Sequence, residues 1–196
     1  MIGVVVGLSR SGTVTEETKG GGLMFYEMEE TTAFNPNAKG TLITTGGGGE
    51  LDKASTDSVT IAYTASKKFM RKMGDTYLEK AQLHINLVLM DGYGKSGPSG
   101  ALAEAIAFIS LARGDKPRAK CAITGQLTIK GFVLKVSSIA EKTQAAMKGK
   151  YTTVVMPAGN KSEFESLPEG GRMGITPKFV STLKEAVLFC FPVPVR

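Results

Sequence analysis

The sequence is poor in residues that carry much catalytic and structural chemistry: its 196 residues include one histidine, two cysteines and no tryptophan. Two cysteines, Cys121 and Cys190, cannot form a disulfide framework and are typical of a reducing, intracellular compartment. His84 and two distant cysteines give no metal-ligand spacing, so no metal site is expected. The apolar runs at residues 85–90 and 186–191 are far shorter than the roughly 20 residues that cross a membrane. The N-terminus lacks the basic segment of a signal peptide.

Nucleotide-binding motifs are also missing. The glycine run at residues 46–49 is not followed by the Lys-Ser/Thr of a P-loop, and no strand leads into GxGxxG. Lys and Arg number 24 against 18 Asp and Glu, a formal net charge of +6, but the two signs are interleaved. Nucleic-acid binders concentrate basic charge on one face, so the pattern argues against nucleic-acid binding as the main function.

Hydrophobic periodicity predicts alternating strands and helices in one domain that spans residues 1–196. Strands are expected at residues 2–8, 23–28, 41–45, 84–90, 119–124 and 152–156, and a hairpin at residues 127–136. Helices are expected at residues 50–73, 101–111, from Ser137 or Ser138 to about Lys148, and 177–188 with Pro177 at the first position. The predicted fold class is α/β (α+β mixed), with mixed β-sheets and packed helices.

Ser99 is a candidate nucleophile because Gly97-Pro98-Ser99-Gly100 stands between a glycine-rich loop and an apolar helix. Small residues let a substrate backbone approach, and backbone N–H groups at a helix N-terminus can stabilise an oxyanion. The alternative is that Ser99 only caps the helix.

A serine mechanism without histidine needs another base, and lysine is the known substitute. Lys142 lies near the start of a predicted helix, where the helix dipole disfavours an ammonium and lowers the lysine pKa. The alternative is a solvated surface pair of Glu141 and Lys142.

Taken together, these segments resemble the proteolytic domain of Lon, the serine–lysine protease attached to AAA+ ATPases. Gly97-Pro98-Ser99 resembles the family's nucleophile motif, and residues 122–125 (AITG) resemble its M-T-G-E strand motif. Residues 131–142 (GFVLKVSSIAEK) resemble G-x-V-L-P-[IV]-G-G-[IL]-K-E-K, and the separation of Ser99 from Lys142 matches the family's spacing. Further similarities, in the same order, are at residues 4–8, 49–55 (GELDKAS), 61–64 (IAYT), 153–157 followed by Asn160-Lys161, and 183–187.

The sequence departs from the family pattern at several positions that bear on substrate-loop geometry and on lysine tuning. The family's D-G-P-S-A-G has Ser96 in place of aspartate and Gly100-Ala101 in reversed order. The other departures are Gln126 for glutamate, Lys135 for proline, Ser137-Ser138 for a glycine pair, and His84 alone in a strand that often carries more histidines.

The resemblance implies a serine endopeptidase with a Ser99–Lys142 dyad, backbone N–H groups around Ser99 as the oxyanion hole, and Thr124 near the dyad. Thr124 could hold the lysine amine or be an ordinary strand threonine. The implied partners are polypeptide substrates, further copies in a homo-oligomeric, usually six-membered ring, and an AAA+ ATPase domain. No Walker motif precedes the domain, so no ATPase domain is expected within these residues. No cofactor is expected either, since ATP and Mg would belong to the attached ATPase.

Two alternatives remain open at this point. The chain could be a standalone or viral polyprotein-processing Ser–Lys protease, because the birnavirus proteases share the dyad and a related fold. It could also be a catalytically weak Lon-fold domain used for binding or assembly, which the altered loop at residues 94–96 favours. The implied location is the cytoplasm or the mitochondrial matrix.

Overall fold

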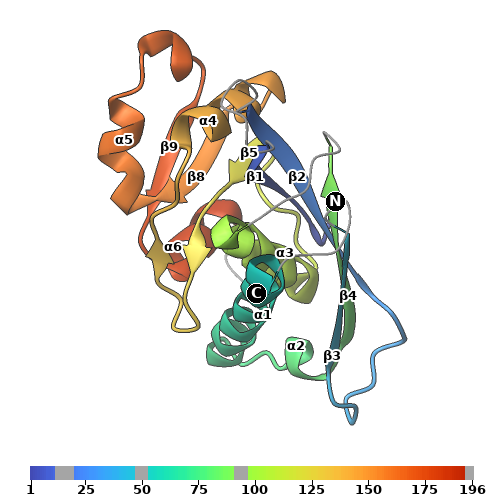
Figure 1. Ribbon diagram of the computed structural model, residues 1–196. Helices are drawn as coiled ribbons and strands as arrows, with labels where there is room; N and C mark the ends of the chain where they lie inside the picture. The colour runs from blue at the N-terminus through green and yellow to red at the C-terminus, as the bar shows by residue number, and fades with distance from the viewer. Residues whose placement is uncertain (12–19, 47–52, 91–96, 193–196) are drawn as a thin grey trace.

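A mixed β-sheet forms the centre of the molecule (Figure 1). The computed structural model describes residues 1–11, 20–46, 53–90 and 97–192. Within these residues the main sheet has seven strands in the order β3-β4-β2-β1-β5-β8-β9. They are β1 (Val4–Ser11), β2 (Gly20–Glu30), β3 (Thr41–Gly46), β4 (Gln82–Leu89), β5 (Cys121–Ile123), β8 (Thr153–Pro157) and β9 (Thr176–Val180).

Strand β1 joins two halves of this sheet that differ in direction. It pairs antiparallel with β2, which pairs antiparallel with β4, while β3 runs parallel to β4. On its other side β1 pairs parallel with β5, and β5, β8 and β9 continue in parallel. The carboxyl ends of β1, β5, β8 and β9 therefore meet at one edge of the sheet. Ligand sites of open α/β sheets commonly lie at such an edge.

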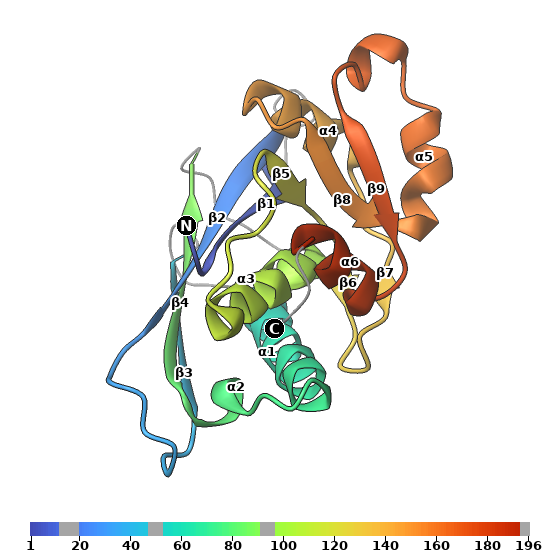
Figure 2. The same cartoon turned by 180° about the vertical axis from the view of Figure 1, so that it is seen from behind.

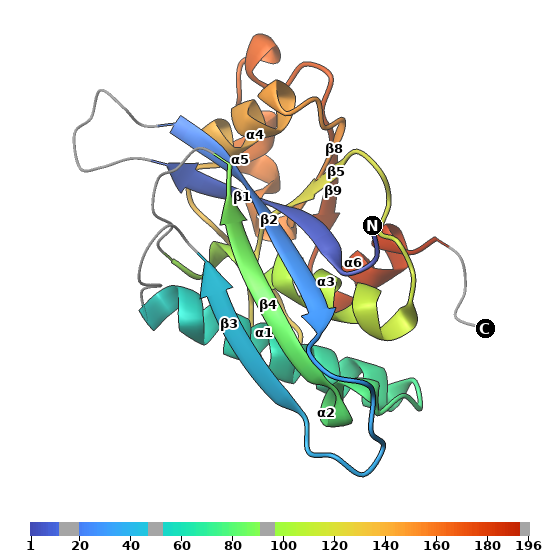
Figure 3. The ribbon, with the colours of Figure 1, turned by 90° about the vertical axis from the view of Figure 1, so that its right-hand side faces the viewer.

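Helices cover both faces of the sheet, as the views in Figures 2 and 3 show. The helices α1 (Lys53–Lys72), α3 (Ala101–Arg113) and α6 (Leu183–Cys190) share one apolar core with the buried residues of β2 and β4. The helices α4 (Ile139–Lys148) and α5 (Lys161–Glu165) share a second core with β1, β5 and β8. Along β5, Ile123 enters the first core and Ala122 the second. This alternation is the two-residue period of a strand buried on both faces.

The sequence predictions are confirmed for most of these elements. The apolar helix expected at residues 101–111 is α3, and Gly114 ends it in the left-handed conformation with φ 65°. The expected hairpin at residues 127–136 forms a separate two-stranded sheet of β6 (Gln126–Leu127) and β7 (Val133–Leu134). The short helix α2 (Tyr77–Lys80) and α5 were not predicted.

The predicted helix over residues 177–188 is wrong in its first half. Residues Thr176–Val180 form β9, an edge strand, where Pro177 is tolerated because an edge strand can do without one ladder N–H. The helix begins only after Thr182, whose hydroxyl accepts the backbone N–H of Glu185 at 3.2 Å. Thr182-x-x-Glu185 is a helix-start signal that outweighs Pro177.

Candidate active site

Ser99 lies in a single 3-10 turn, η2 (Pro98–Gly100), directly before α3. Gly97 enters the turn with φ 100°, a left-handed conformation that glycine adopts without strain. The N-cap residue of α3 is Gly100, and no side-chain hydrogen bond caps that helix. The capping alternative for Ser99 is therefore wrong, and the Ser99 side chain is only partly buried.

The backbone of Ser99 is fastened to the segment that follows β5. The Ser99 carbonyl accepts the backbone N–H of Gly125 at 2.9 Å and the hydroxyl of Thr124 at 3.3 Å. The Gly125 carbonyl in turn accepts the N–H of Leu102 at 3.0 Å. Thr124 is completely buried, and its N–H donates to the Val155 carbonyl of β8. These bonds fix the turn that carries Ser99 against the carboxyl end of β5.

Lys142 lies in the first turn of α4 and is only 3% exposed. Its backbone N–H donates to the Ser138 carbonyl at 3.1 Å. The surface-pair alternative for Lys142 is therefore wrong, since the side chain belongs to the buried face of α4. Its neighbours on that face, Ile139, Ala145 and Ala146, belong to the core that α4 forms with the sheet.

The register of the sheet places α4 at the same edge as Thr124. Gly21 of β2 pairs with Arg10, near the carboxyl end of β1, and approaches the Glu141 carbonyl of α4. Further back along β1, Gly7 pairs with Ile123, after which the chain reaches Thr124. The Ser99 turn and Thr124 are therefore joined by hydrogen bonds at the carboxyl end of β5, and α4, which carries Lys142, packs beside the carboxyl end of β1.

Ser138, immediately before α4, has a left-handed backbone with φ 63°. The family pattern has glycine here, so the serine adopts a conformation that costs a non-glycine residue about 1 kcal/mol. Ser138 occupies the N-cap position that the sequence predicted, but its side chain makes no capping hydrogen bond.

His84 lies elsewhere. It is half-buried in β4, and its Nε2 is 2.7 Å from the Thr45 hydroxyl of β3. The strands β2 and β1 separate β4 from β5, and three strand spacings amount to roughly 14 Å. This placement agrees with a structural histidine.

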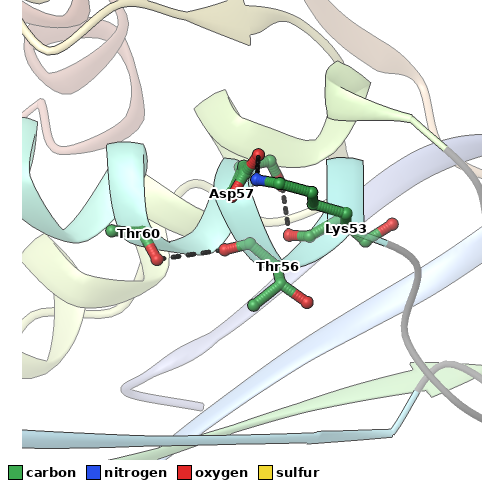
Figure 4. A network of polar contacts seen from close by, with 6 residues as sticks. Lys53, Thr56, Asp57 and Thr60 are labelled. Atoms are coloured by element: carbon green, nitrogen blue, oxygen red, sulfur yellow. Dashed lines mark hydrogen bonds and ion pairs between the residues drawn. The ribbon is translucent and has the colours of Figure 1, made fainter.

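A cavity and a network of polar contacts lie away from the carboxyl ends of β1 and β5. A cavity of about 740 Å³ is lined by α1, α6 and the hairpin loop, and Ser99, Thr124 and Lys142 do not line it. At the start of α1, Lys53 pairs with Asp57 at 2.7 Å and Thr60 donates to the Thr56 carbonyl (Figure 4). These contacts join exposed residues one helical turn apart and stabilise α1 locally.

Some residues named in the sequence predictions lie outside the described parts of the chain. Residues 47–52, which include part of the GELDKAS match, and residues 91–96, which include Ser96, lie outside the described residues. Among the described residues, no group of three or more His, Cys, Asp or Glu side chains could hold a metal ion. No helix in the described ranges is long and apolar enough to span a membrane.

The sequence profile of the Lon protease (S16) C-terminal proteolytic domain matches residues 1–191. The chain belongs to this family. It is thus a Lon-type proteolytic domain, a member of a serine peptidase family, and its single-domain mixed α/β fold agrees with the fold expected from the resemblance.

Curated relatives support the same assignment. The chain is 34% identical over 185 residues to "Lon protease homolog, mitochondrial" of Ostreococcus lucimarinus, which covers 93% of this chain and 18% of that protein. It is 35% identical over 156 residues to "Lon protease 2" of Borreliella burgdorferi, covering 80% of this chain and 19% of that protein. It is 33% identical over 195 residues to the human "Lon protease homolog, mitochondrial", and the match covers 97% of this chain and 19% of that protein. The chain therefore spans less than a fifth of the length of these relatives.

Proposed function

We propose that this Lon proteolytic domain is a serine endopeptidase that uses Ser99 as nucleophile and Lys142 as general base. The observation that carries the proposal is the burial of a lysine at the edge of the sheet to which the Ser99 turn is fastened. Lysine is rarely fully buried, and active sites are where ionisable groups are commonly buried to tune their chemistry. Family membership supports the reaction class, and the burial of Lys142 together with the hydrogen bonds that fasten the Ser99 turn supports our choice of these two residues.

Neutral Lys142 removes the proton of the Ser99 hydroxyl as Ser99 attacks a peptide carbonyl. The resulting ammonium protonates the leaving amine, and an acyl-enzyme remains on Ser99. The amine then activates a water molecule that hydrolyses the ester. Backbone N–H groups near Ser99 stabilise the oxyanion in both steps.

Two features of α4 favour the neutral amine that this mechanism needs. Burial disfavours the charged form of an amine because an ammonium loses its hydration. The positive end of the helix dipole lies at the first turn of α4, where Lys142 is found. The Thr124 hydroxyl donates to the Ser99 carbonyl, so the contribution we assign to Thr124 is to hold the nucleophile's turn.

The wider setting is a proposal from the relatives, which are Lon proteases of about five times this length. We place the chain in an ATP-dependent protease that cleaves unfolded polypeptides delivered by an AAA+ ATPase domain. ATP and Mg belong to that ATPase, and this domain needs no cofactor. Assembly is a homo-oligomeric ring, and the location is the mitochondrial matrix or the cytoplasm.

A fluorophosphonate probe tests the nucleophile directly. We expect the probe to label the wild-type protein on Ser99, as located by peptide mass spectrometry, and to stop hydrolysis of unfolded casein. Ser99→Ala should lose both labelling and activity, while Ser162→Ala, at an exposed serine of α5, should keep both. A folded wild-type protein that neither reacts nor hydrolyses casein would instead indicate a binding or assembly domain.

A further inference from the structure

The segment that leads from β7 into α4 is held by a side chain from a different part of the chain. Asn160, at the end of the 3-10 turn η3 (Ala158–Asn160) after β8, is completely buried. Its Oδ1 accepts the Val136 N–H at 3.0 Å, and its Nδ2 donates to the Val136 carbonyl at 2.8 Å. Asn160 thus pairs with both backbone groups of Val136, as a neighbouring β-strand would.

Glu163 of α5 completes this contact. Its Oε2 accepts a second hydrogen bond from Asn160 Nδ2 at 2.8 Å, and its Oε1 accepts the Ile139 N–H at 3.4 Å. Ile139 is the first residue of α4, and N–H groups of a first helical turn have no acceptor inside their helix. A carboxylate at that position also interacts favourably with the helix dipole. Glu163 therefore replaces the cap that the Ser138 side chain does not provide.

These contacts lead to Lys142 through one short stretch of backbone. Ser138, with its left-handed conformation, lies between Val136 and Ile139, and its carbonyl accepts the Lys142 N–H. The place where α4 begins therefore fixes the place of Lys142, three residues further along the helix. Gly159 lets the turn that carries Asn160 pack closely against the segment before α4, because a β-carbon there would lie 2.6 Å from Lys135 Cγ.

We propose that Asn160 and Glu163 are positioning residues that hold Lys142 in place for catalysis by fixing Val136 and Ile139. The inference rests on the proposed function, in which Lys142 is the general base. Neither side chain acts on the substrate, so their loss should lower kcat and leave KM unchanged. A misplacement of about 1 Å can lower a rate by about 100-fold.

The first variant is Asn160→Asp, which keeps the size and the acceptor for Val136 N–H. It removes the Nδ2 donor and places a carboxylate oxygen against the Val136 carbonyl and the Glu163 carboxylate. We expect kcat on an unstructured peptide to fall by about 10- to 100-fold, the range seen when residues that orient metal ligands are replaced. Circular dichroism and a thermal scan should show that the protein is folded at the assay temperature.

The second variant, Glu163→Ala, changes an exposed residue and avoids the risk of unfolding a buried site. Its matched control is Glu165→Ala, an exposed glutamate of the same short helix whose ion-pair partner is Lys161 at 3.8 Å. We expect Glu163→Ala to lower kcat by about 3- to 10-fold, as partial loss of orientation predicts, and Glu165→Ala to stay near wild type.

An exchange variant tests the contact between the two residues. In Asn160→Asp with Glu163→Gln, the amide and the carboxylate trade places, so the net charge and the side-chain hydrogen bond return. The donor to the Val136 carbonyl stays missing, and a neutral amide replaces the carboxylate beside the Ile139 N–H. We expect this double variant to recover part of the kcat that Asn160→Asp loses, a recovery that damage to general packing would not produce.

The outcomes separate the inference from the proposed function. Folded Asn160→Asp with wild-type kcat would overturn the inference. So would equal kcat for Glu163→Ala and Glu165→Ala, which decides the matter if Asn160→Asp does not fold. A rise in KM alongside the fall in kcat of the single variants would also count against it. So would a double variant whose kcat is no higher than that of Asn160→Asp. Failure of the proposed function shows separately, as activity that survives Ser99→Ala.

Discussion

Gly21 and Glu141 lie so close together that only glycine fits at position 21. A β-carbon on Gly21 would be 1.8 Å from the Glu141 carbonyl oxygen and 2.4 Å from its carbon. Gly21 belongs to β2 and Glu141 to α4, so this contact sets how closely the helix that carries Lys142 packs on the sheet. Two backbones meet here, and neither can move by rotating a side chain.

Gly21→Ala should therefore displace α4 and lower peptidase activity. Because the clash is with backbone atoms, we expect a loss of about 1–3 kcal/mol of unfolding free energy, the usual cost of overpacking. Urea unfolding followed by circular dichroism measures the loss, and peptide hydrolysis under folded conditions measures the effect on Lys142. Gly170→Ala is the control, because a β-carbon there meets nothing within 4 Å. Equal stability and activity of the two variants would contradict the packing argument.

Ser138→Gly should make the protein more stable, although a glycine normally weakens a structure. Ser138 has φ 63° and no capping hydrogen bond, so glycine removes strain and loses no partner. We expect a gain of about 0.5 kcal/mol, the strain relieved minus the extra entropy of the unfolded glycine chain. Ser137→Gly, whose residue is exposed and has no positive φ, should give no gain. Chemical denaturation of the two variants side by side compares them, and a destabilised Ser138→Gly would show that the left-handed serine is not strained.

His84→Ala should leave turnover nearly unchanged. The His84 ring contacts the Thr45 hydroxyl in β3, and two strands separate it from the segment that fastens Ser99. We expect unfolding free energy to fall by about 1 kcal/mol for the lost hydrogen bond and kcat to stay within about twofold of wild type. Initial rates below the unfolding transition provide the measurement. A folded His84→Ala protein without activity would restore a histidine mechanism.

Cys121 should react with iodoacetamide before Cys190 does. Both thiols line a cavity of about 240 Å³, but Cys121 is 8% exposed and Cys190 is fully buried. A hydrogen bond from Cys190 lowers the pKa of the Cys121 thiol, and the charge of Arg118 acts in the same direction. Donating that bond, together with burial, raises the pKa of Cys190. Since the thiolate is the nucleophile, Cys121 should be alkylated first, and its alkylation should become faster as the pH rises.

Peptide mass spectrometry at successive times measures the order of alkylation, with Cys121→Ser as the control. In that variant Cys190 should remain unmodified for as long as the protein stays folded. Faster labelling of Cys190 in the wild-type protein would show that the bond runs from Cys121 to Cys190 instead.

The order of strands and helices follows from sequence pattern because most elements have a clear apolar period. The helical spacing of Val59, Ala62 and Ala65 in α1 is an example. The same patterns could not show that Lys142 is buried, because Glu141-Lys142 has the composition of a solvated helix surface. Burial there depends on the packing of α4 against β2, which brings together residues about 120 positions apart. Sequence-local information does not contain that contact.

The contacts of Asn160 are a second case that the sequence pattern could not predict. Asn160 and Lys161 resemble a family motif, but that motif does not show what Asn160 contacts. Asn160 bonds Val136 directly and reaches Ile139 through Glu163, and both residues lie more than 20 positions away in the sequence. The helix predicted to start at Pro177 is wrong for a different reason. Proline is tolerated both at a helix start and in an edge strand, so its presence does not distinguish the two. The position of a strand within its sheet decides between the two, and only the topology shows it.

Lys142→Arg separates a general base from a structural cation. Arginine keeps the positive charge and nearly the length, but a guanidinium stays protonated at any working pH and cannot accept the Ser99 proton. If Lys142 is the base, Lys142→Arg should lose at least about 1,000-fold in kcat, comparable to the loss of a nucleophile. The control is Lys148→Arg, an exposed lysine of the same helix, which should keep wild-type rates.

The pH dependence gives the same test without a substitution. The reaction needs the neutral amine, so wild-type rates on an unstructured peptide should rise from pH 6 to pH 10 as the amine loses its proton. Lys148→Arg should follow the same curve, and Lys142→Arg should show no rise at any pH. Circular dichroism at each pH keeps unfolding apart from loss of the base. A folded Lys142→Arg protein with near-normal rates would remove Lys142 from the mechanism, since an arginine there could act only through its charge.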